Sequence, residues 1–325
     1  MERSLEQGIS VVVPSFNGAR TLEEFVRRVG EVLSRGGERF ELVLINDGST
    51  DDSWEEIRRL AGEHDWVRGF SLMRNYGQHN ALLCGIRAAR YSVTVTLDDD
   101  LQHPPEEIPR LLERLTPGID VVYALPRRVK HPWSHILASN LLKLSIATTL
   151  GIRTARIVSP FRAFRTNLRN AFRDSRSPSV IVDVYLTWAT DRFASIRVRH
   201  EERSVGRTAY TPWRRFNQAW DMVAGFSTFP LRLASWVGFL FTLFGVGILV
   251  YVFWVYFMLG GTIPGWAFLA STIAIFSGAQ LFALGILGEY LARMFQRLMD
   301  RPAYAISDST DALVSPTEGN SRRVQ

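Results

Sequence analysis

The sequence predicts an α/β domain with a doubly wound, mostly parallel sheet, followed by an interfacial helix and two transmembrane helices. Two observations carry this prediction. Short β-branched runs alternate with segments of helical spacing between Ile9 and Leu97. From Leu233 to Gly288 the chain has no Asp, Glu, Lys or Arg. With 325 residues, it is long enough for one large domain or two ordinary ones.

Strands and helices alternate through the first part of the chain. Thr21 is a plausible N-cap of the first helix, because its hydroxyl can accept a free amide hydrogen. Ligands of doubly wound sheets bind beyond the carboxyl ends of the strands. The segments 14–17, 47–49 and 98–100 are therefore expected to meet at one edge. The expected strands are 9–13, 41–45, 70–72 and 93–97, and the expected helices are 21–35, 51–61 and 80–90.

Three consecutive carboxylates, Asp98 to Asp100, follow the buried strand 93–97. Like charges this close repel one another strongly. A divalent cation such as Mg²⁺ makes the arrangement favourable, since hard ions bind carboxylate oxygens and share them with phosphates. The alternative is a solvated acidic turn. The expected meeting of three strand ends favours the cation.

The uncharged stretch divides into two spans, about 233–259 and 266–288, separated by a short Gly- and Pro-containing loop. Each is long enough to cross a hydrocarbon core of about 20 helical residues. The alternative, two buried core helices of a soluble protein, is disfavoured because helices of this length would carry a charged face and these segments have none. Arginines flank the pair but not the loop, so the positive-inside rule places both termini in the cytoplasm. The flanking arginines are Arg214, Arg215, Arg232, Arg293, Arg297 and Arg301.

The net charge of +6 and the pI of about 9.7 fit an anionic membrane surface better than nucleic acid, because the arginines border the spans. Thr211–Ser227 has amphipathic spacing and is expected to lie in the membrane interface, with a packing helix as the alternative. The resulting domains are 1–210, 211–232, 233–292 and a tail, 293–325. The tail is expected to be disordered after 306.

Several function classes lack their motifs. There is neither a Gly-x-Gly-x-x-Gly nor a Gly-Lys-Ser phosphate loop, so a dinucleotide oxidoreductase and a P-loop NTPase are unsupported. The six histidines show no zinc spacing. Cys84 is the one cysteine, so an intramolecular disulfide is impossible. The N-terminus lacks the apolar region of a signal peptide.

Three motifs resemble family 2 glycosyltransferases of the GT-A fold: Val11–Asn17, Asn46–Asp51 and Asp98-x-Asp100. Two longer strings, Arg74–Ala81 and Leu97–Pro109, are similar to the polyisoprenyl-phosphate glycosyltransferases within that family. Two further segments, 200–206 and 287–293, extend the resemblance to about residues 9–304. The long strings are specific, whereas Asp-x-Asp alone is a weak motif.

The resemblance implies inverting transfer of one sugar from a nucleotide-sugar, a UDP-sugar, to a polyisoprenyl phosphate such as undecaprenyl phosphate. It places the reaction at the cytoplasmic face of the inner membrane, and some relatives are tetramers. The implied metal is Mg²⁺ or Mn²⁺. The implied roles are Asp98, Asp100 and Gln102 for the metal, Asp47, Pro14 and Phe16 for the base, Arg203 for a phosphate, and Ser139 for the acceptor phosphate.

The sequence departs from this group at Arg156, where an acidic residue proposed as the base is usual. A lysine is also missing at Ala209, and His135 replaces a frequent arginine. A phosphate acceptor is largely dianionic at neutral pH, so it needs cations rather than a base. Arg156 is therefore expected to bind the acceptor phosphate, and the alternative is a surface arginine. The expected clamp is Arg127, Arg128, Arg156 and Arg207.

Two other functions remain open at this point. A processive polysaccharide synthase shares the nucleotide-binding half, but it normally adds a Gln-x-x-Arg-Trp motif and more spans, whereas this sequence has no such motif and two expected spans. A membrane scaffold that has lost activity would explain Arg156 and Ala209, although Asp47, Asp98 and Asp100 are all present.

Overall fold

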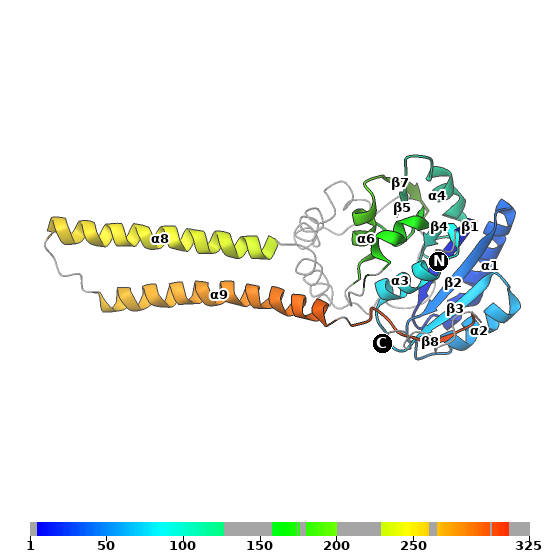
Figure 1. The fold of residues 1–325 in the computed structure, drawn as a ribbon, viewed down its shortest axis with the longest axis horizontal. Coiled ribbons are helices and arrows are strands. Elements are labelled where there is room, and N and C mark those ends of the chain that lie inside the picture. The colour runs from blue at the N-terminus through cyan, green and yellow to red at the C-terminus, as the bar shows by residue number, and fades with distance from the viewer. Residues whose placement is uncertain are drawn as a thin grey trace, which may run out of the picture. The chain divides into compact units, whose positions relative to one another are not determined.

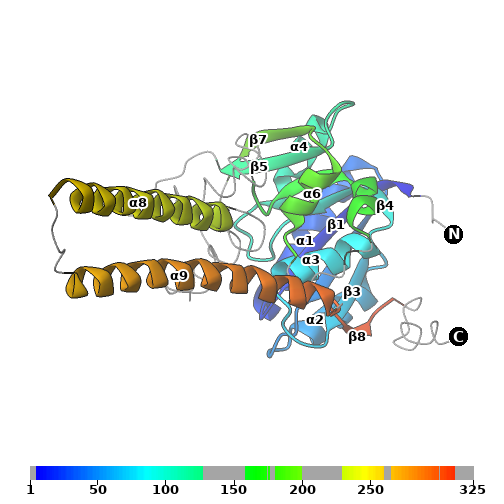
Figure 2. The same ribbon diagram turned by 60° about the vertical axis from the view of Figure 1, so that its left-hand side comes forward.

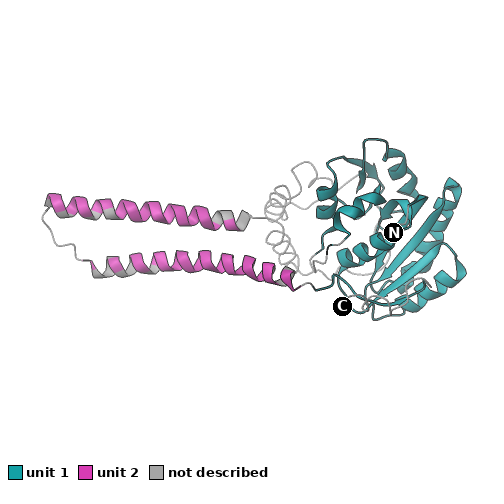
Figure 3. Ribbon diagram, viewed as in Figure 1, with its two compact units in different colours: residues 1–137, 150–209, 300–325 teal, residues 138–149, 210–299 magenta. Residues whose placement is uncertain are grey.

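The computed structural model describes residues 5–126, 158–173, 175, 180–199, 229–259, 265–299 and 301–311. The chain divides into two compact units (Figure 3). The first comprises residues 1–137, 150–209 and 300–325, and the second comprises residues 138–149 and 210–299. The first unit therefore includes residues on both sides of the hydrophobic stretch in the sequence.

The first unit contains an eight-stranded sheet of order β7-β5-β6-β4-β1-β2-β3-β8 in the described part of the chain (Figures 1 and 2). The strands β4, β1, β2 and β3 are mutually parallel neighbours, and β5 and β7 also pair in parallel. β6 is antiparallel to both of its neighbours, and β8 is antiparallel to β3. The predicted mostly parallel α/β sheet is confirmed. The strands are β1 (Glu6–Ser15), β2 (Phe40–Asn46), β3 (Val67–Leu72), β4 (Tyr91–Thr96), β5 (Val121–Pro126), β6 (Arg162–Arg165), β7 (Phe193–Val198) and β8 (Ile306–Ser309).

Helices cover both faces of this sheet. α1 (Ala19–Gly36), α2 (Ser53–Glu63) and α4 (Ile108–Arg114) bury their apolar residues in one core cluster. α3 (Gln78–Ala88) and α6 (Val182–Ala189) pack in the cluster on the other face. Val11 and Val13 belong to the first cluster and Val12 to the second, because successive strand side chains point to opposite faces. Two short 3₁₀ turns, η1 (Pro105–Glu107) and η4 (Thr166–Phe172), complete the described elements of this unit.

Several element boundaries differ from the sequence prediction. α1 begins at Ala19 after an N-cap at Gly18, and the Thr21 hydroxyl donates to the Gly18 carbonyl oxygen at 3.0 Å, so Thr21 is not the cap. β3 begins at Val67 rather than at residue 70. Its second residue, Arg68, is buried and forms an ion pair with Glu41 at 2.6 Å. Because this pair compensates the charge, the strand can include Arg68.

The second unit contains two long helices, α8 (Phe229–Leu259) and α9 (Trp266–Leu298). Each has an apolar window long enough to cross a membrane, at Ala234–Val255 and Ile275–Ala292. The helices lie side by side (Figures 1 and 2), and Phe241 contacts Phe276 with ring centroids 5.9 Å apart. Large apolar side chains are exposed along both helices, which suits a lipid environment rather than a soluble core. The expected interfacial helix, 211–227, lies outside the described residues.

The prediction that the tail is disordered after 306 is wrong for residues 307–311. Ile306–Ser309 forms β8 and pairs with β3. The segment is polar, so its periodicity gave no signal for a strand. Its acidic side chains find partners only in the folded domain: Asp308 accepts from the Trp54 indole at 3.2 Å, and Asp311 pairs with Arg68. The predicted domain, residues 1–210, consequently does not include the whole sheet, because β8 lies beyond it in the sequence.

A glycine on α3 allows that helix to lie close to the sheet. A Cβ at Gly85 would lie 2.3 Å from the Val12 side chain of β1 and 3.2 Å from that of Ile45 on β2. We expect Gly85→Ala to lower the thermal unfolding midpoint of the detergent-solubilised protein, since overpacking costs about 1–3 kcal/mol. Gly62→Ala in α2 is the matched control: no atom lies within 4 Å, so alanine should be neutral or stabilising by up to about 1 kcal/mol. Equal midpoints for the two variants would contradict this packing.

Candidate functional site

The loops that follow β1 and β2 are joined by hydrogen bonds at the carboxyl edge of the sheet. The Asn17 side-chain oxygen accepts from the Thr50 amide at 2.9 Å, and the Asn17 amide donates to the Ser49 hydroxyl at 3.0 Å. The Gly18 amide donates to the Ser53 hydroxyl at 3.0 Å. Asn17 has a φ of 54°, in the left-handed region that asparagine tolerates better than most residues. The structure thus joins two of the segments that the sequence predicts to meet.

Asp47, at the end of β2, ties this edge to the loop after β3. Its carboxylate accepts two backbone N–H groups, from Tyr76 at 2.7 Å and from Gly77 at 2.9 Å. Its own amide donates to the Ser15 carbonyl oxygen at 2.9 Å. Burial raises the pKa of the Asp47 carboxyl, and the two backbone hydrogen bonds oppose that rise. Asp47 therefore fixes the position of the loop 73–77, a role that the sequence prediction did not include.

The acidic triplet lies directly after β4, and its carboxylates have different partners. Asp99 accepts from the Ser15 hydroxyl at 2.5 Å, which ties it to the end of β1. Asp98 accepts from the Gln78 side-chain amide at 2.5 Å, at the start of α3. Asp100 accepts from the backbone amide of Gln102 at 3.1 Å. All four loop segments at the carboxyl ends of β1 to β4 are therefore connected.

A left-handed turn shapes the chain directly after the triplet. Leu101 has a φ of 60°, which is unusual for a non-glycine residue, and its side chain is buried in the core. Such a conformation costs about 1–3 kcal/mol, and the packing of the leucine side chain stabilises it. Leu101 lies between Asp100 and Gln102, so this turn sets the direction of the backbone between two of the residues expected to bind the metal.

The donor atoms of this segment fit a hard divalent cation, because Asp98, Asp100 and Gln102 offer oxygens and no sulfur. Among the described residues, no group of three or more His, Cys, Asp and Glu side chains is arranged so that it could hold a metal ion. The chain would supply part of a coordination shell, as magnesium sites that share a ligand's phosphates do.

The residues expected around the base differ in exposure. Phe16, directly after β1, is 49% exposed and presents an apolar ring at the carboxyl edge. Pro14 is buried within β1, in register with Ile45 of β2. In the loop after β3, the guanidinium of Arg74 lies 4.7 Å from the ring centroid of Tyr76. The remaining predicted site residues lie outside the described part of the chain: Arg127, Arg128, Ser139, Arg156, Arg203 and Arg207.

A buried ion pair that the sequence did not reveal supports the end of β4. Arg162 of β6 pairs with Asp183 of α6, and both are buried. The Arg162 Nε atom donates to the Thr96 hydroxyl at 3.0 Å, and the Tyr123 hydroxyl donates to Asp183 at 2.9 Å. Thr96 is the last residue of β4, two residues before Asp98.

His79 lies one residue after Gln78 and is close enough to this ion pair to feel both charges. Burial lowers the pKa of His79; Asp183 opposes this shift and Arg162 adds to it. The Nδ1 atom is buried and has no hydrogen-bond partner among the described residues. The imidazole is therefore neutral at physiological pH.

The lowered pKa of His79 makes stability depend on pH. The unfolded chain binds a proton near the ordinary histidine value, while the folded chain resists it, so stability decreases as the pH falls through about 6.5. We expect the unfolding midpoint to decrease between about pH 7.5 and about pH 5.5, and His79→Gln to make this dependence weaker. His64→Gln removes a histidine at the end of α2 and is measured in parallel as the comparison variant. An unchanged slope in His79→Gln would contradict the assignment.

Comparison with known proteins agrees with this geometry. Residues 10–174 match glycosyl transferase family 2. The chain is 36% identical to an undecaprenyl-phosphate 4-deoxy-4-formamido-L-arabinose transferase of Pseudomonas aeruginosa, over 97% of this chain and 94% of the relative. It is 33% identical to the enzyme of the same name from Aeromonas hydrophila, over 95% of this chain and 96% of the relative.

A solved structure shares the fold. Glucosyl-3-phosphoglycerate synthase from Mycobacterium tuberculosis, in complex with Mn²⁺, UDP-glucose and phosphoglyceric acid, aligns with a TM-score of 0.50 and 19% identity. The alignment covers 67% of this chain and 78% of the synthase, and it shows likeness of fold alone. The family match, the full-length relatives and the joined strand ends together show that this chain is a glycosyltransferase and belongs to glycosyl transferase family 2.

Proposed function

We propose that the chain transfers one sugar from a UDP-sugar to a polyprenyl phosphate, with a divalent metal and with inversion at the anomeric carbon. One observation carries the proposal: the carboxylates Asp98 and Asp100 follow β4 where the loops after β1, β2 and β3 also meet. The names of the full-length relatives support undecaprenyl phosphate as the acceptor.

The donor would bind across the carboxyl edge of the sheet. Phe16 offers an exposed ring on which a base can stack, and the Asp47 carboxylate is an acceptor for a base N–H. Each Asp47 oxygen already accepts one backbone N–H, and a carboxylate has about four lone-pair sites in total. The carboxylate can thus fix the loop 73–77 and still accept from a base.

Asp98, Asp100 and Gln102 would hold Mg²⁺ or Mn²⁺ beside the donor diphosphate. The metal, when bound, neutralises the negative charge that grows on the diphosphate leaving group as the glycosidic bond breaks. Gln78 and Gln102 orient two of these carboxylates through hydrogen bonds. Asp99 contributes by holding the triplet against Ser15 at the end of β1.

The acceptor would react without a general base. A phosphate monoester is largely dianionic at neutral pH, so one of its oxygens can attack the anomeric carbon directly, opposite the leaving diphosphate. The new carbon–oxygen bond then forms on the face opposite the broken bond, which inverts the centre. We assign the acceptor phosphate to Arg127, Arg128, Ser139, Arg156 and Arg207, and a further phosphate contact to Arg203.

The apolar helices α8 and α9 would anchor the enzyme in the inner membrane, where a lipid phosphate is available. We propose that the domain and both termini are cytoplasmic, because arginines flank the two spans and the loop between them has none. The product, a sugar on a polyprenyl phosphate, would serve as a donor for modification of a cell-envelope glycan.

Transfer from a panel of radiolabelled nucleotide sugars to undecaprenyl phosphate in detergent tests the reaction. We expect a single labelled lipid, formed with Mg²⁺ or Mn²⁺ and abolished by EDTA. Asp100→Asn keeps the size of the side chain but removes its charge, so turnover should fall about 100-fold or more. The exposed Asp65→Asn loses the same charge elsewhere and is the control. Wild-type turnover in Asp100→Asn, or in the presence of EDTA, would contradict the proposed metal site. A labelled polymer would indicate a processive synthase. Nucleotide binding without any sugar transfer would indicate a scaffold.

Arg156 tests the acceptor site separately. If its guanidinium binds the acceptor phosphate, Arg156→Ala should raise the KM for the lipid phosphate by about tenfold or more, because a charge-assisted hydrogen bond is lost. Arg156→Lys keeps the charge and should retain part of the affinity. The exposed Arg58→Ala is the control. An Arg156→Ala enzyme with unchanged KM and turnover would exclude this role.

A further inference from the structure

The C-terminal strap, residues 301–311, follows α9 in the sequence and belongs to the first unit. Its strand β8 adds to the edge strand β3, with Phe70 opposite Ser309 and Ser71 opposite Asp308. An edge strand such as β3 exposes unpaired backbone groups unless something covers it. The strap is therefore part of the sheet, although the sequence separates it from β3 by both membrane helices.

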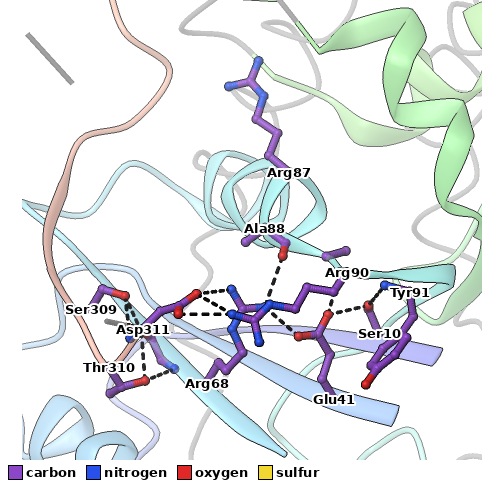
Figure 4. Close-up of polar contacts among 12 residues, drawn as sticks. Ser10, Glu41, Arg68, Arg87, Ala88, Arg90, Tyr91, Ser309, Thr310 and Asp311 are labelled. Carbon is purple, nitrogen blue, oxygen red and sulfur yellow. Dashed lines mark hydrogen bonds and ion pairs between the residues drawn. The ribbon is translucent and has the colours of Figure 1, made fainter. Parts of the chain in front are cut away.

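Buried charges recognise the strap specifically (Figure 4). Asp311 pairs with Arg68 at 2.5 Å and with Arg90 at 3.0 Å. Arg68 also pairs with Glu41 of β2 at 2.6 Å, and Glu41 accepts from the Ser10 hydroxyl at 2.6 Å. The side chains of Asp311 and Arg68 are only about one-tenth exposed, and that of Glu41 still less. Without Asp311, Arg68 would keep Glu41 as a carboxylate partner, and the partly exposed Arg90 guanidinium would lose its contact with the strap, so Asp311 completes the pairing of both arginines.

Apolar contacts hold the other end of the strap. Ala303 is buried in the core cluster that contains α3, and Tyr304 packs against the same cluster. Burial raises the pKa of Tyr304 to about 12, and the Arg87 guanidinium lies 5.7 Å from the Tyr304 ring centroid. The strap is thus fixed at both ends, by Tyr304 against α3 and by Asp311 against β3.

Between these ends, the strap contacts the loop that leads to the proposed nucleotide pocket. The backbone amide of Met73 donates to the Ala305 carbonyl oxygen at 2.9 Å, and the Ser307 hydroxyl donates to the Ser71 carbonyl oxygen at 3.0 Å. Met73 begins the loop 73–77, whose last two amides bind Asp47. Hydrogen bonds therefore hold this short loop at both ends, to the strap at Met73 and to Asp47 at Tyr76 and Gly77.

The backbones of the loops after β2 and β3 approach each other closely beside Asp47. Gly48, next to Asp47, has a φ of 65°, and a Cβ there would lie 2.3 Å from the Arg74 carbonyl carbon. The loop after β3 can approach the loop after β2 this closely because residue 48 has no side chain. A shift of Met73 would therefore displace the amides of Tyr76 and Gly77 relative to Asp47.

We propose that the C-terminal strap is a positioning element of the nucleotide pocket: by holding Met73 it fixes the loop whose amides orient Asp47. The inference rests on the proposed role of Asp47 in binding the base. It gives the segment after the second membrane helix a part in donor binding, without any contact of its own with the nucleotide.

Asp311→Asn in the full-length protein tests this, with UDP plus Mn²⁺ as the calorimetric probe. We expect about tenfold weaker UDP binding and a higher KM for the donor, since a small displacement of a binding group costs this much or more. The turnover number and the KM for the lipid phosphate should stay near wild type. A merely structural role would instead reduce the active fraction and leave the UDP affinity of the folded protein unchanged, and that result would overturn the inference. Asp311→Glu should restore part of the affinity, and Asp65→Asn should have none of these effects.

Hydrogen exchange provides a readout that does not depend on the nucleotide. Amides of the 70–80 segment should exchange about tenfold faster in Asp311→Asn, while those of β1 stay protected. If Asp311→Asn does not fold, Asp308→Ala is the milder variant, because it removes only the acceptors of Trp54 and Ser309. Unchanged exchange of this segment in the folded variant would overturn the inference. If wild-type protein binds no UDP, the proposed pocket fails, and faster exchange in the variants would still support the link between strap and loop.

Discussion

The structure depends on one electrostatic constraint: three carboxylates follow a buried strand and have to be held together. Two unit charges about 4 Å apart interact by about 4 kcal/mol near a protein surface. Asp98 and Asp99 are held by side chains from two other elements, α3 and the end of β1. The same contacts bring the loops after β1, β3 and β4 together, so the arrangement that stabilises the acidic triplet also forms the edge on which a nucleotide-sugar would bind.

Buried ion pairs define the two ends of this arrangement. Arg162 pairs with Asp183 and donates a hydrogen bond to Thr96, the last residue of β4, close to the triplet. Arg68 and Asp311 lie at the other edge of the sheet and hold the C-terminal strap. Buried ion pairs add little net stability, but the loss of one partner costs about 3–5 kcal/mol. In this domain both pairs join segments that lie far apart in the chain.

Much of the fold was predictable because its signals are local. The expected helix 21–35 lies within α1, and its five apolar residues from Leu22 to Leu33 are all buried at helical spacing. The alternation of strands and helices gave the parallel sheet, and the absence of charge gave both apolar helices. The predictions failed where burial of a polar side chain depends on a distant partner. Arg68 lies inside β3 because Glu41 is beside it, and the polar segment 306–311 is ordered because Trp54, Arg68 and Arg90 receive it.

The candidate site likewise combines residues that the sequence predicted with contacts that it did not predict. By itself, the sequence determined the residue types and the sheet edge: Asp47, Asp98, Asp100 and Gln102 follow strands whose carboxyl ends had to meet. Only the tertiary structure decided which carboxylate has which partner, because those hydrogen bonds join residues far apart in the chain. Asp99 binds Ser15, Asp98 binds Gln78, and Asp47 holds the amides of Tyr76 and Gly77. Hydrophobic periodicity reports which face of an element is buried, whereas the pairing of buried polar groups depends on three-dimensional distance, which no local pattern encodes.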